Sequence, residues 1–244
     1  MNVVTILSIV AAAAFPFMGG YVLRADTGSC ANRVFAVSAL LMTYWSIFAA
    51  LSISAPDAEH AFFWFRLSSL GWTVIPGFMF RLFTEMTGHA ERTWIRVVQV
   101  VIYMVGLAFF ILPVFTTKQN TGMVQTPLGF SYLVAPGILP WLYDAFVTVC
   151  LVPVLVVLLI QGRRSLHPAV RARDFLVVGV SVVTLTLLYG ADRLLHVLDL
   201  VRVPSLSHLV MMVWMVGIGV AVARYRLFSL TPELAAQNIV ETMA

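Results

Sequence analysis

The chain has 244 residues, of which 61% are hydrophobic and only 11% are charged. Soluble domains have about 25% charged residues, so this composition excludes an ordinary soluble domain and indicates an integral membrane protein. The formal net charge of +4 comes from arginines between apolar segments, which does not indicate a nucleic-acid partner.

Seven apolar runs are each long enough to cross about 30 Å of hydrocarbon as a helix. They lie near residues 3–23, 34–54, 61–86, 95–115, 140–161, 174–198 and 206–224. If the N-terminus is outside, the outer loops hold only Lys118 and Arg202. The inner side then holds Arg24, Arg33, Arg92, Arg96, Arg163, Arg164, Arg171, Arg173, Arg224 and Arg226. Because basic residues mark the cytoplasmic side, the sequence predicts an all-α, seven-helix transmembrane bundle with the N-terminus outside and the C-terminus in the cytoplasm.

The third apolar run carries polar and small residues at steps of three or four positions, namely Arg66, Ser69, Thr73, Gly77 and Arg81. This spacing places them along one side of a helix. An arginine at the bilayer centre costs about 2.5–3.5 kcal/mol on insertion scales, so it faces a bundle interior or snorkels outward. We therefore expect this helix to be the wall of a ligand or signalling cavity. Arg81 and Glu85, four residues apart, are expected to pair locally.

The longest connection, residues 116–139, mixes turn residues with the apolar side chains Phe130, Tyr132 and Leu133. Two interpretations are open. The segment is either a lid over the bundle or a loop that lies in the lipid headgroups.

Several polar side chains are expected at a similar depth near the outer surface. The fifth helix begins with Trp141 and Asp144, and the sixth ends with Tyr189, Asp192, Arg193 and His196. One interpretation is a structural salt bridge that joins the third, fifth and sixth helices. The other is a pocket in which Arg66 or Arg193 anchors an acidic or carbonyl group, while aromatic rings and methionines of the seventh helix hold the apolar part of the ligand.

The pocket interpretation gives these candidate ligand-binding residues: Trp64, Arg66, Ser69, Thr73, Trp141, Asp144, Tyr189, Asp192, Arg193, His196, Met211 and Met215. His60, His196 and His208 lie near the same surface but lack the spacing of a metal motif. No nucleophilic triad, HExxH sequence or phosphate-binding glycine loop is present. We therefore predict no catalytic residue, metal or cofactor in this segment.

Two segments resemble a known family. The run FFWFRLSSLGWTVIPGFMFRLFTEMTG and the terminal run RYRLFSLTPELAAQNIVETM are similar to the seven-transmembrane N-terminal sensor domain of bacterial histidine kinases. Arg66, Gly71 and Pro76 match the first pattern, and Leu227, Phe228 and Pro232 match the segment that leaves the membrane. Arg81 and Met86 depart from the first pattern. The resemblance implies a sensory input module that usually works as a dimer, placed before a histidine kinase or diguanylate cyclase module.

We expect residues 1–226 to form the sensor domain and residues 227–244 to begin a cytoplasmic linker helix to an output domain outside this sequence. The leading hypothesis is a receptor in the bacterial inner membrane, embedded among membrane lipids. It would bind a small amphipathic or lipid-like signal in its outer half and relay it through the seventh helix to Leu227, Phe228 and Pro232. The alternatives are a small-molecule transporter or channel, and a ligand-free dimerising anchor or membrane sensor.

Overall fold

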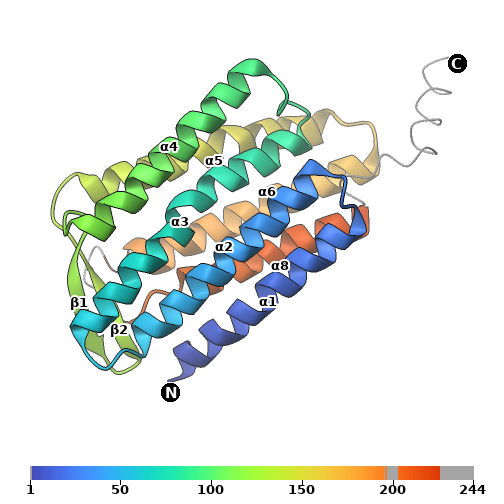
Figure 1. Cartoon of the computed structure of the whole chain (residues 1–244). Coiled ribbons are helices and arrows are strands. Elements are labelled where there is room, and N and C mark those ends of the chain that lie inside the picture. The colour runs from blue at the N-terminus through green and yellow to red at the C-terminus, as the bar shows by residue number, and fades with distance from the viewer. Residues whose placement is uncertain (1, 195, 197–202, 226–244) are drawn as a thin grey trace, which may run out of the picture.

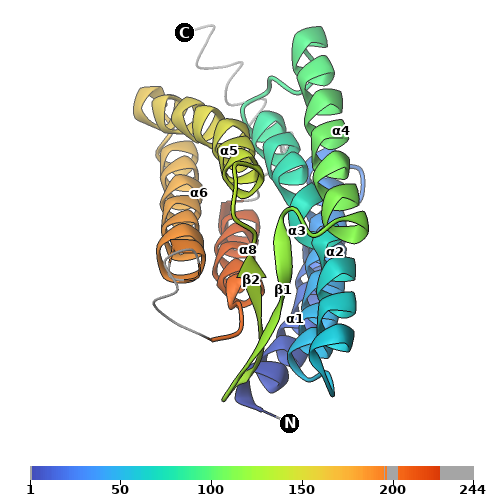
Figure 2. The same cartoon turned by 90° about the vertical axis from the view of Figure 1, so that its left-hand side faces the viewer.

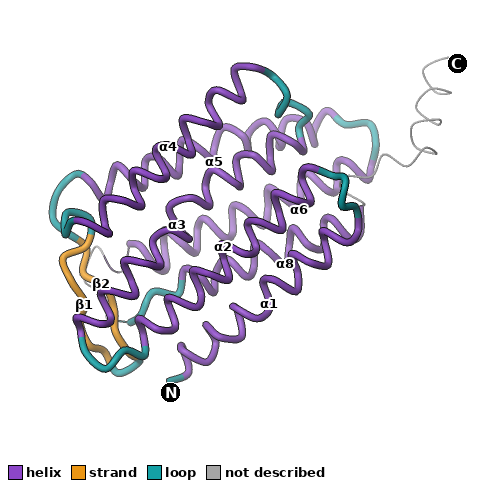
Figure 3. The backbone as a smooth tube through the Cα atoms, in the orientation of Figure 1, coloured by secondary structure: helices purple, strands orange, loops and turns teal. Residues whose placement is uncertain are grey.

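The computed structural model describes residues 2–194, 196 and 203–225. This part of the chain is mostly helical, with a short β-hairpin at one end (Figures 1 and 3). The helices are α1 (Val3–Ala25), α2 (Cys30–Ile53), α3 (Ala58–Met86), α4 (Thr93–Phe115), α5 (Leu139–Arg164), α6 (Pro168–Thr186), the π-helix η1 (Leu187–Leu194) and α8 (Ser207–Tyr225). The strands are β1 (Asn120–Thr126) and β2 (Gly129–Val134).

Each predicted apolar run coincides with a helix, and the sixth run covers α6 together with η1. Five helical segments of the described chain are long and apolar enough to cross a membrane: α1, α2, α4, α5 and residues 168–190. The described part of α8 is a shorter apolar helix. The 29-residue α3 is not among the five, since its arginine, serine and threonine side chains lower its hydropathy.

The prediction of an all-α fold is wrong for the long connection, where β1 and β2 pair antiparallel. Thr126 pairs with Gly129, so Pro127 and Leu128 form a tight two-residue turn between the strands. Gly129 has a φ of +111°, and a Cβ there would lie 2.5 Å from the carbonyl oxygen of Ile53. Only glycine suits this position. The Thr-Pro-Leu-Gly sequence was the available signal for a turn.

The hairpin and the N-terminus lie at the same end of the bundle, which we call the hairpin end (Figure 1). Asn2 joins them, because its Nδ2 donates a hydrogen bond to the carbonyl oxygen of Leu128 at 2.6 Å. Figure 2 shows the hairpin in front of α3 and α8, with β1 on the side of α3 and β2 on the side of α8. The connections 26–29, 87–92 and 165–167 lie at the opposite end, together with the arginines beside them.

Small residues let the helices approach closely, as expected where lipid supplies no hydrophobic force between helices. A Cβ added to Gly71 of α3 would lie 2.5 Å from the Cβ of Trp45 in α2. A Cβ at Gly217 of α8 would lie 2.6 Å from Val180 of α6. These contacts hold α2 against α3 and α6 against α8.

Candidate functional site

A cavity of about 170 Å³ lies among the helices at the hairpin end. Its walls come from α2, α3, α5, α6, η1 and α8. The hairpin contributes Met123, Phe130 and Tyr132, so this segment faces the bundle interior as a lid would. The volume resembles that of an apolar cavity of about 150 Å³ that accepts benzene. The space therefore suits one ring or a short chain.

The third helix lines this cavity, as predicted, but with a different face from the predicted stripe. Its lining residues are Phe65, Ser68, Trp72, Ile75, Pro76 and Met79. Ser69 and Thr73 are fully buried, and their hydroxyls donate to carbonyl oxygens of α3 itself. Gly77 accepts a hydrogen bond from Gln99 of α4 through its carbonyl oxygen at 2.9 Å. The predicted stripe thus serves helix packing.

Pro76 interrupts the hydrogen bonds of α3 beside the cavity. A proline has no N–H to donate to the carbonyl four residues earlier, which here belongs to Trp72. The hydroxyl of Tyr143, on α5, donates to this carbonyl oxygen at 2.8 Å. The rings of Trp72 and Tyr143 also meet edge to face, with centroids 4.8 Å apart. The break in α3 therefore creates a specific contact with α5.

The hairpin is fastened to the bundle by a stack of three rings. Tyr132 of β2 stacks on Phe65 of α3 with centroids 5.3 Å apart, and on His196 with centroids 4.7 Å apart. The neighbouring Ser131 donates to the carbonyl oxygen of Val203 at 2.7 Å. The lid is therefore tied both to α3 and to the segment that precedes α8.

The family model of the N-terminal 7TM region of histidine kinase matches residues 7–232. The chain belongs to this family. Comparison with curated proteins gave no match. The 7TM region of a histidine kinase is its membrane sensory input module and is not itself catalytic, and the apolar helices fit a multi-pass membrane protein.

Three of the predicted ligand residues of this 7TM region line the cavity: Asp144, Tyr189 and Met211. Other predicted residues lie elsewhere. Trp64 packs on Phe48 between α3 and α2, Trp141 is 56% exposed, and Met215 is fully buried below the cavity. His196 belongs to the ring stack that holds the hairpin. The binding roles of these residues stay predictions.

Arg66 does not line the cavity and makes no ion pair with another described residue. Its guanidinium carbon lies 4.2 Å from the ring centroid of Phe62, a cation–π contact, and its Nε has no hydrogen-bond partner there. The side chains of Asp192 and Arg193 lie outside the described part of the chain, as do Leu227, Phe228 and Pro232.

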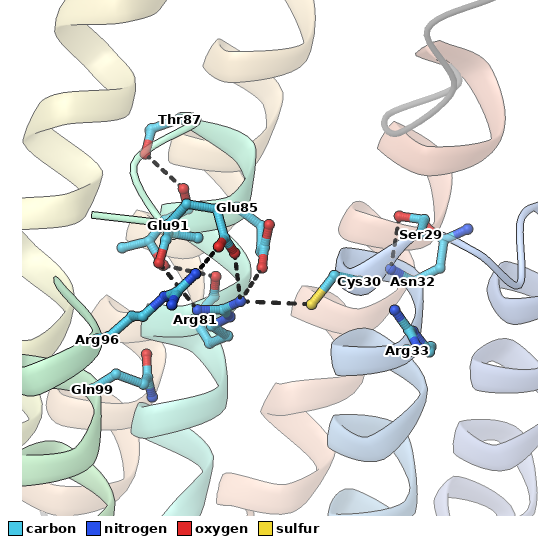
Figure 4. Close-up of polar contacts among 12 residues, drawn as sticks. Ser29, Cys30, Asn32, Arg33, Arg81, Glu85, Thr87, Glu91, Arg96 and Gln99 are labelled. Carbon is cyan, nitrogen blue, oxygen red and sulfur yellow. Dashed lines mark hydrogen bonds and ion pairs between the residues drawn. The ribbon is translucent and has the colours of Figure 1, made fainter. Parts of the chain in front are cut away.

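At the end opposite the hairpin, Arg81 is the centre of a polar cluster (Figure 4). The predicted pair with Glu85 is confirmed, with an N–O distance of 2.5 Å. Arg81 also lies 3.7 Å from Glu91 and 3.7 Å from the sulfur of Cys30 in α2, and Glu91 pairs with Arg96 of α4. Arg81, which departs from the family pattern, thus links α3 to α2 and to the α3–α4 connection.

The cavity also contains residues that sequence reasoning did not assign to a site. His208 of α8 lines it, and only its proximity to the outer surface was apparent from the sequence. Gln119 and Asn120, which enter the hairpin, line it as well. Their contribution depends on how the hairpin folds back, for which the sequence gave only the turn signal.

Proposed function

We propose that this 7TM region binds a small amphipathic or lipid-like molecule in the cavity at the hairpin end and relays its binding through α8. The observation that carries this proposal is a largely apolar cavity lined jointly by the helices and the hairpin, with Met211 of α8 in its wall. An occupant in contact with α8 has a differential affinity for different positions of that helix, which is the requirement for a ligand-driven shift.

The packing of α8 below the cavity supports the relay. Trp214, three residues after Met211, is fully buried, and its Nε1 donates to the hydroxyl of Ser181 in α6 at 3.1 Å. Its ring contacts Phe35 of α2 and Phe83 of α3. A displacement of Met211 therefore acts on a side chain that contacts three other helices.

The same proposal covers the organisation of the receptor. Residues 1–226 form the seven-span sensor domain in a bacterial inner membrane, with the hairpin end outside, and residues 227–244 lead to an output module of the histidine kinase or diguanylate cyclase type. The arginines near connections 26–29, 87–92 and 165–167 support this orientation, since basic residues favour the cytoplasmic side. The full-length receptor acts as a homodimer.

The test is native mass spectrometry of the purified chain released from lipid nanodiscs, with identification of any retained small molecule. Ala49 of α2 lines the cavity, so Ala49→Phe fills it. Ala108 of α4 lies on the exposed surface of the bundle, so Ala108→Phe is the matched control. We expect a defined amphiphile that Ala49→Phe loses and Ala108→Phe keeps.

An Arg66→Ala variant tests separately the ligand role predicted for that residue. Retention of the same molecule by Ala49→Phe contradicts binding in this cavity. A wild-type chain that is folded but carries no molecule, and gains no thermal stability from added membrane-lipid extract, favours the anchor alternative.

A further inference from the structure

A pair of polar side chains joins the first and last helices beside the cavity. Ser8 of α1 is fully buried, and its hydroxyl donates to the carbonyl oxygen of Val4 at 2.8 Å. The same oxygen lies 2.7 Å from Nε2 of His208 in α8. A hydroxyl has a single hydrogen, and we assign it to the Val4 contact because a carbonyl oxygen can only accept, whereas a ring nitrogen can also donate. The imidazole is therefore the donor in the second contact, and Nε2 carries the hydrogen.

This assignment fixes the character of the other ring nitrogen. His208 is 1% exposed, and no carboxylate of the described chain pairs with it. A buried, unpaired imidazolium is strongly disfavoured, so the ring is neutral. In a neutral imidazole with hydrogen on Nε2, Nδ1 is an acceptor. Nδ1 makes no hydrogen bond within the described residues, and His208 lines the cavity.

Two further lining residues have unsatisfied oxygens. Gln119, before β1, and Thr184, on α6, are 3% and 1% exposed. Neither Gln119 Oε1 nor Thr184 Oγ1 has a hydrogen-bond partner in the described part of the chain. Buried polar atoms of proteins are normally hydrogen-bonded to the protein or to ordered water, so each unsatisfied atom calls for an explanation. Both oxygens are buried in the cavity wall and have almost no accessible surface. Nδ1 of His208 is therefore the acceptor that we consider for a ligand.

The charged residues around the cavity also favour an uncharged ligand. No lysine or arginine is among its described lining residues, and Asp144 is the only acidic one. An anionic ligand therefore meets no positive side chain among the described lining residues. This differs from the expectation that Arg66 anchors an acidic group.

We propose that the cavity selects an uncharged, hydroxyl-bearing amphiphile, whose O–H donates a hydrogen bond to Nδ1 of His208 while its apolar body fills the space. Ser8 is a positioning residue in this arrangement, since it holds the hydrogen on Nε2. The inference rests on the proposed function, that the cavity binds a ligand at all.

Three probes of similar size test the ligand class in lipid nanodiscs that contain the chain: 4-ethylphenol, 4-ethylanisole, which lacks the donor, and 4-ethylbenzoate, which is anionic. We expect the phenol to bind about tenfold more tightly than the anisole, the scale of one hydrogen bond to a buried acceptor, and the benzoate to bind most weakly. His208→Phe should bring the phenol-to-anisole ratio to about one. His208→Asn, which places an amide oxygen near the position of Nδ1, should restore part of the preference.

His60→Phe, the same substitution at an exposed histidine of the hairpin end, should leave the ratio unchanged. Because the ratio is compared between variants, partition of the probes into lipid cancels. If all three probes bind equally and Ala49→Phe abolishes their binding, the proposed ligand class is wrong but binding in the cavity is supported. Binding that Ala49→Phe does not weaken, or no binding at millimolar concentration, overturns both.

The tautomer has its own measurement in ¹⁵N NMR of the histidine side chains. Wild-type chain should show His208 with hydrogen on Nε2. Ser8→Ala, which removes the acceptor for that hydrogen, should give a mixture of both tautomers in a folded chain. A hydrogen on Nδ1 in the wild type overturns the proposal.

Discussion

Removal of the Tyr143 hydroxyl is the sharpest test of how α3 is held beside the cavity. Pro76 denies the Trp72 carbonyl its helical partner, and Tyr143 donates to that carbonyl at 2.8 Å. In Tyr143→Phe the carbonyl oxygen loses this bond, while the edge-to-face contact with Trp72 and the contact with Phe109, 5.3 Å between centroids, are kept. The variant therefore removes the hydroxyl while these two ring contacts stay.

The expected loss of stability in Tyr143→Phe depends on the missing N–H of Pro76, which leaves the Trp72 carbonyl without a helical partner. Hydrogen bonds between transmembrane helices average about 0.6 kcal/mol and reach about 1.7 kcal/mol. The Trp72 carbonyl belongs near the upper value because its helical donor is absent, so we expect a loss of about 1.5 kcal/mol. For a chain of this length that corresponds to a decrease of about 3–6 °C in Tm at roughly 2–4 °C per kcal/mol.

A double-mutant cycle with Pro76→Ala gives the decisive comparison, because alanine supplies the missing N–H. In the Pro76→Ala background, Tyr143→Phe should cost only about 0.5 kcal/mol, so the coupling is about 1 kcal/mol. Tyr44→Phe is the matched control. Its hydroxyl donates to the Leu67 carbonyl at 3.0 Å, and Gly71, four residues later, has an N–H. Thermal unfolding in nanodiscs measures all variants. Equal losses for Tyr143→Phe in both backgrounds would refute the reasoning.

Three further outcomes are expected. The pKa of the exposed His60 is raised above its ordinary value of 6.5, mainly by the side-chain hydrogen bond with Asp57. The contribution of this pair to stability is therefore present below pH 6.5 and is lost as the pH rises through the raised pKa. An NMR titration should show this, and Asp57→Asn should return the pKa toward 6.5. Trp214→Phe removes the hydrogen-bond donor to Ser181 and should lower the free energy of unfolding by about 1 kcal/mol. The affinity for a cavity ligand should change less than twofold. A tenfold loss of affinity would contradict the placement of Trp214 below the cavity. Arg81→Met should lower the Tm and raise amide hydrogen exchange in the α3–α4 connection, because Glu91 loses one of its two arginine partners. Exchange rates equal to those of the wild type would show that the Arg81–Glu91 pair does not stabilise this connection.

Periodicity and length located the helices, because an apolar run long enough to span a bilayer leaves few other structures possible. The same reasoning paired Arg81 with Glu85, which are neighbours on one helix. It placed Arg66, Ser69, Thr73, Gly77 and Arg81 along one side of α3, and we expected that side to line the cavity. The sequence did not say which neighbour that face meets, and the stripe packs against other helices while Trp72 and Pro76 face the cavity.

The polar contacts around the cavity could not be predicted from the sequence, because they join segments that are far apart along the chain. Ser8 and His208 are 200 residues apart, and neither has a local pattern that predicts the other. Gln119 lines the cavity from just before β1, where its carbonyl oxygen accepts a hydrogen bond from the N–H of Ala135, sixteen residues later. Ser8 itself does not line the cavity. In the proposed arrangement, a residue outside the cavity wall therefore determines, through the hydrogen on Nε2 of His208, whether the cavity presents an acceptor or a donor to a ligand.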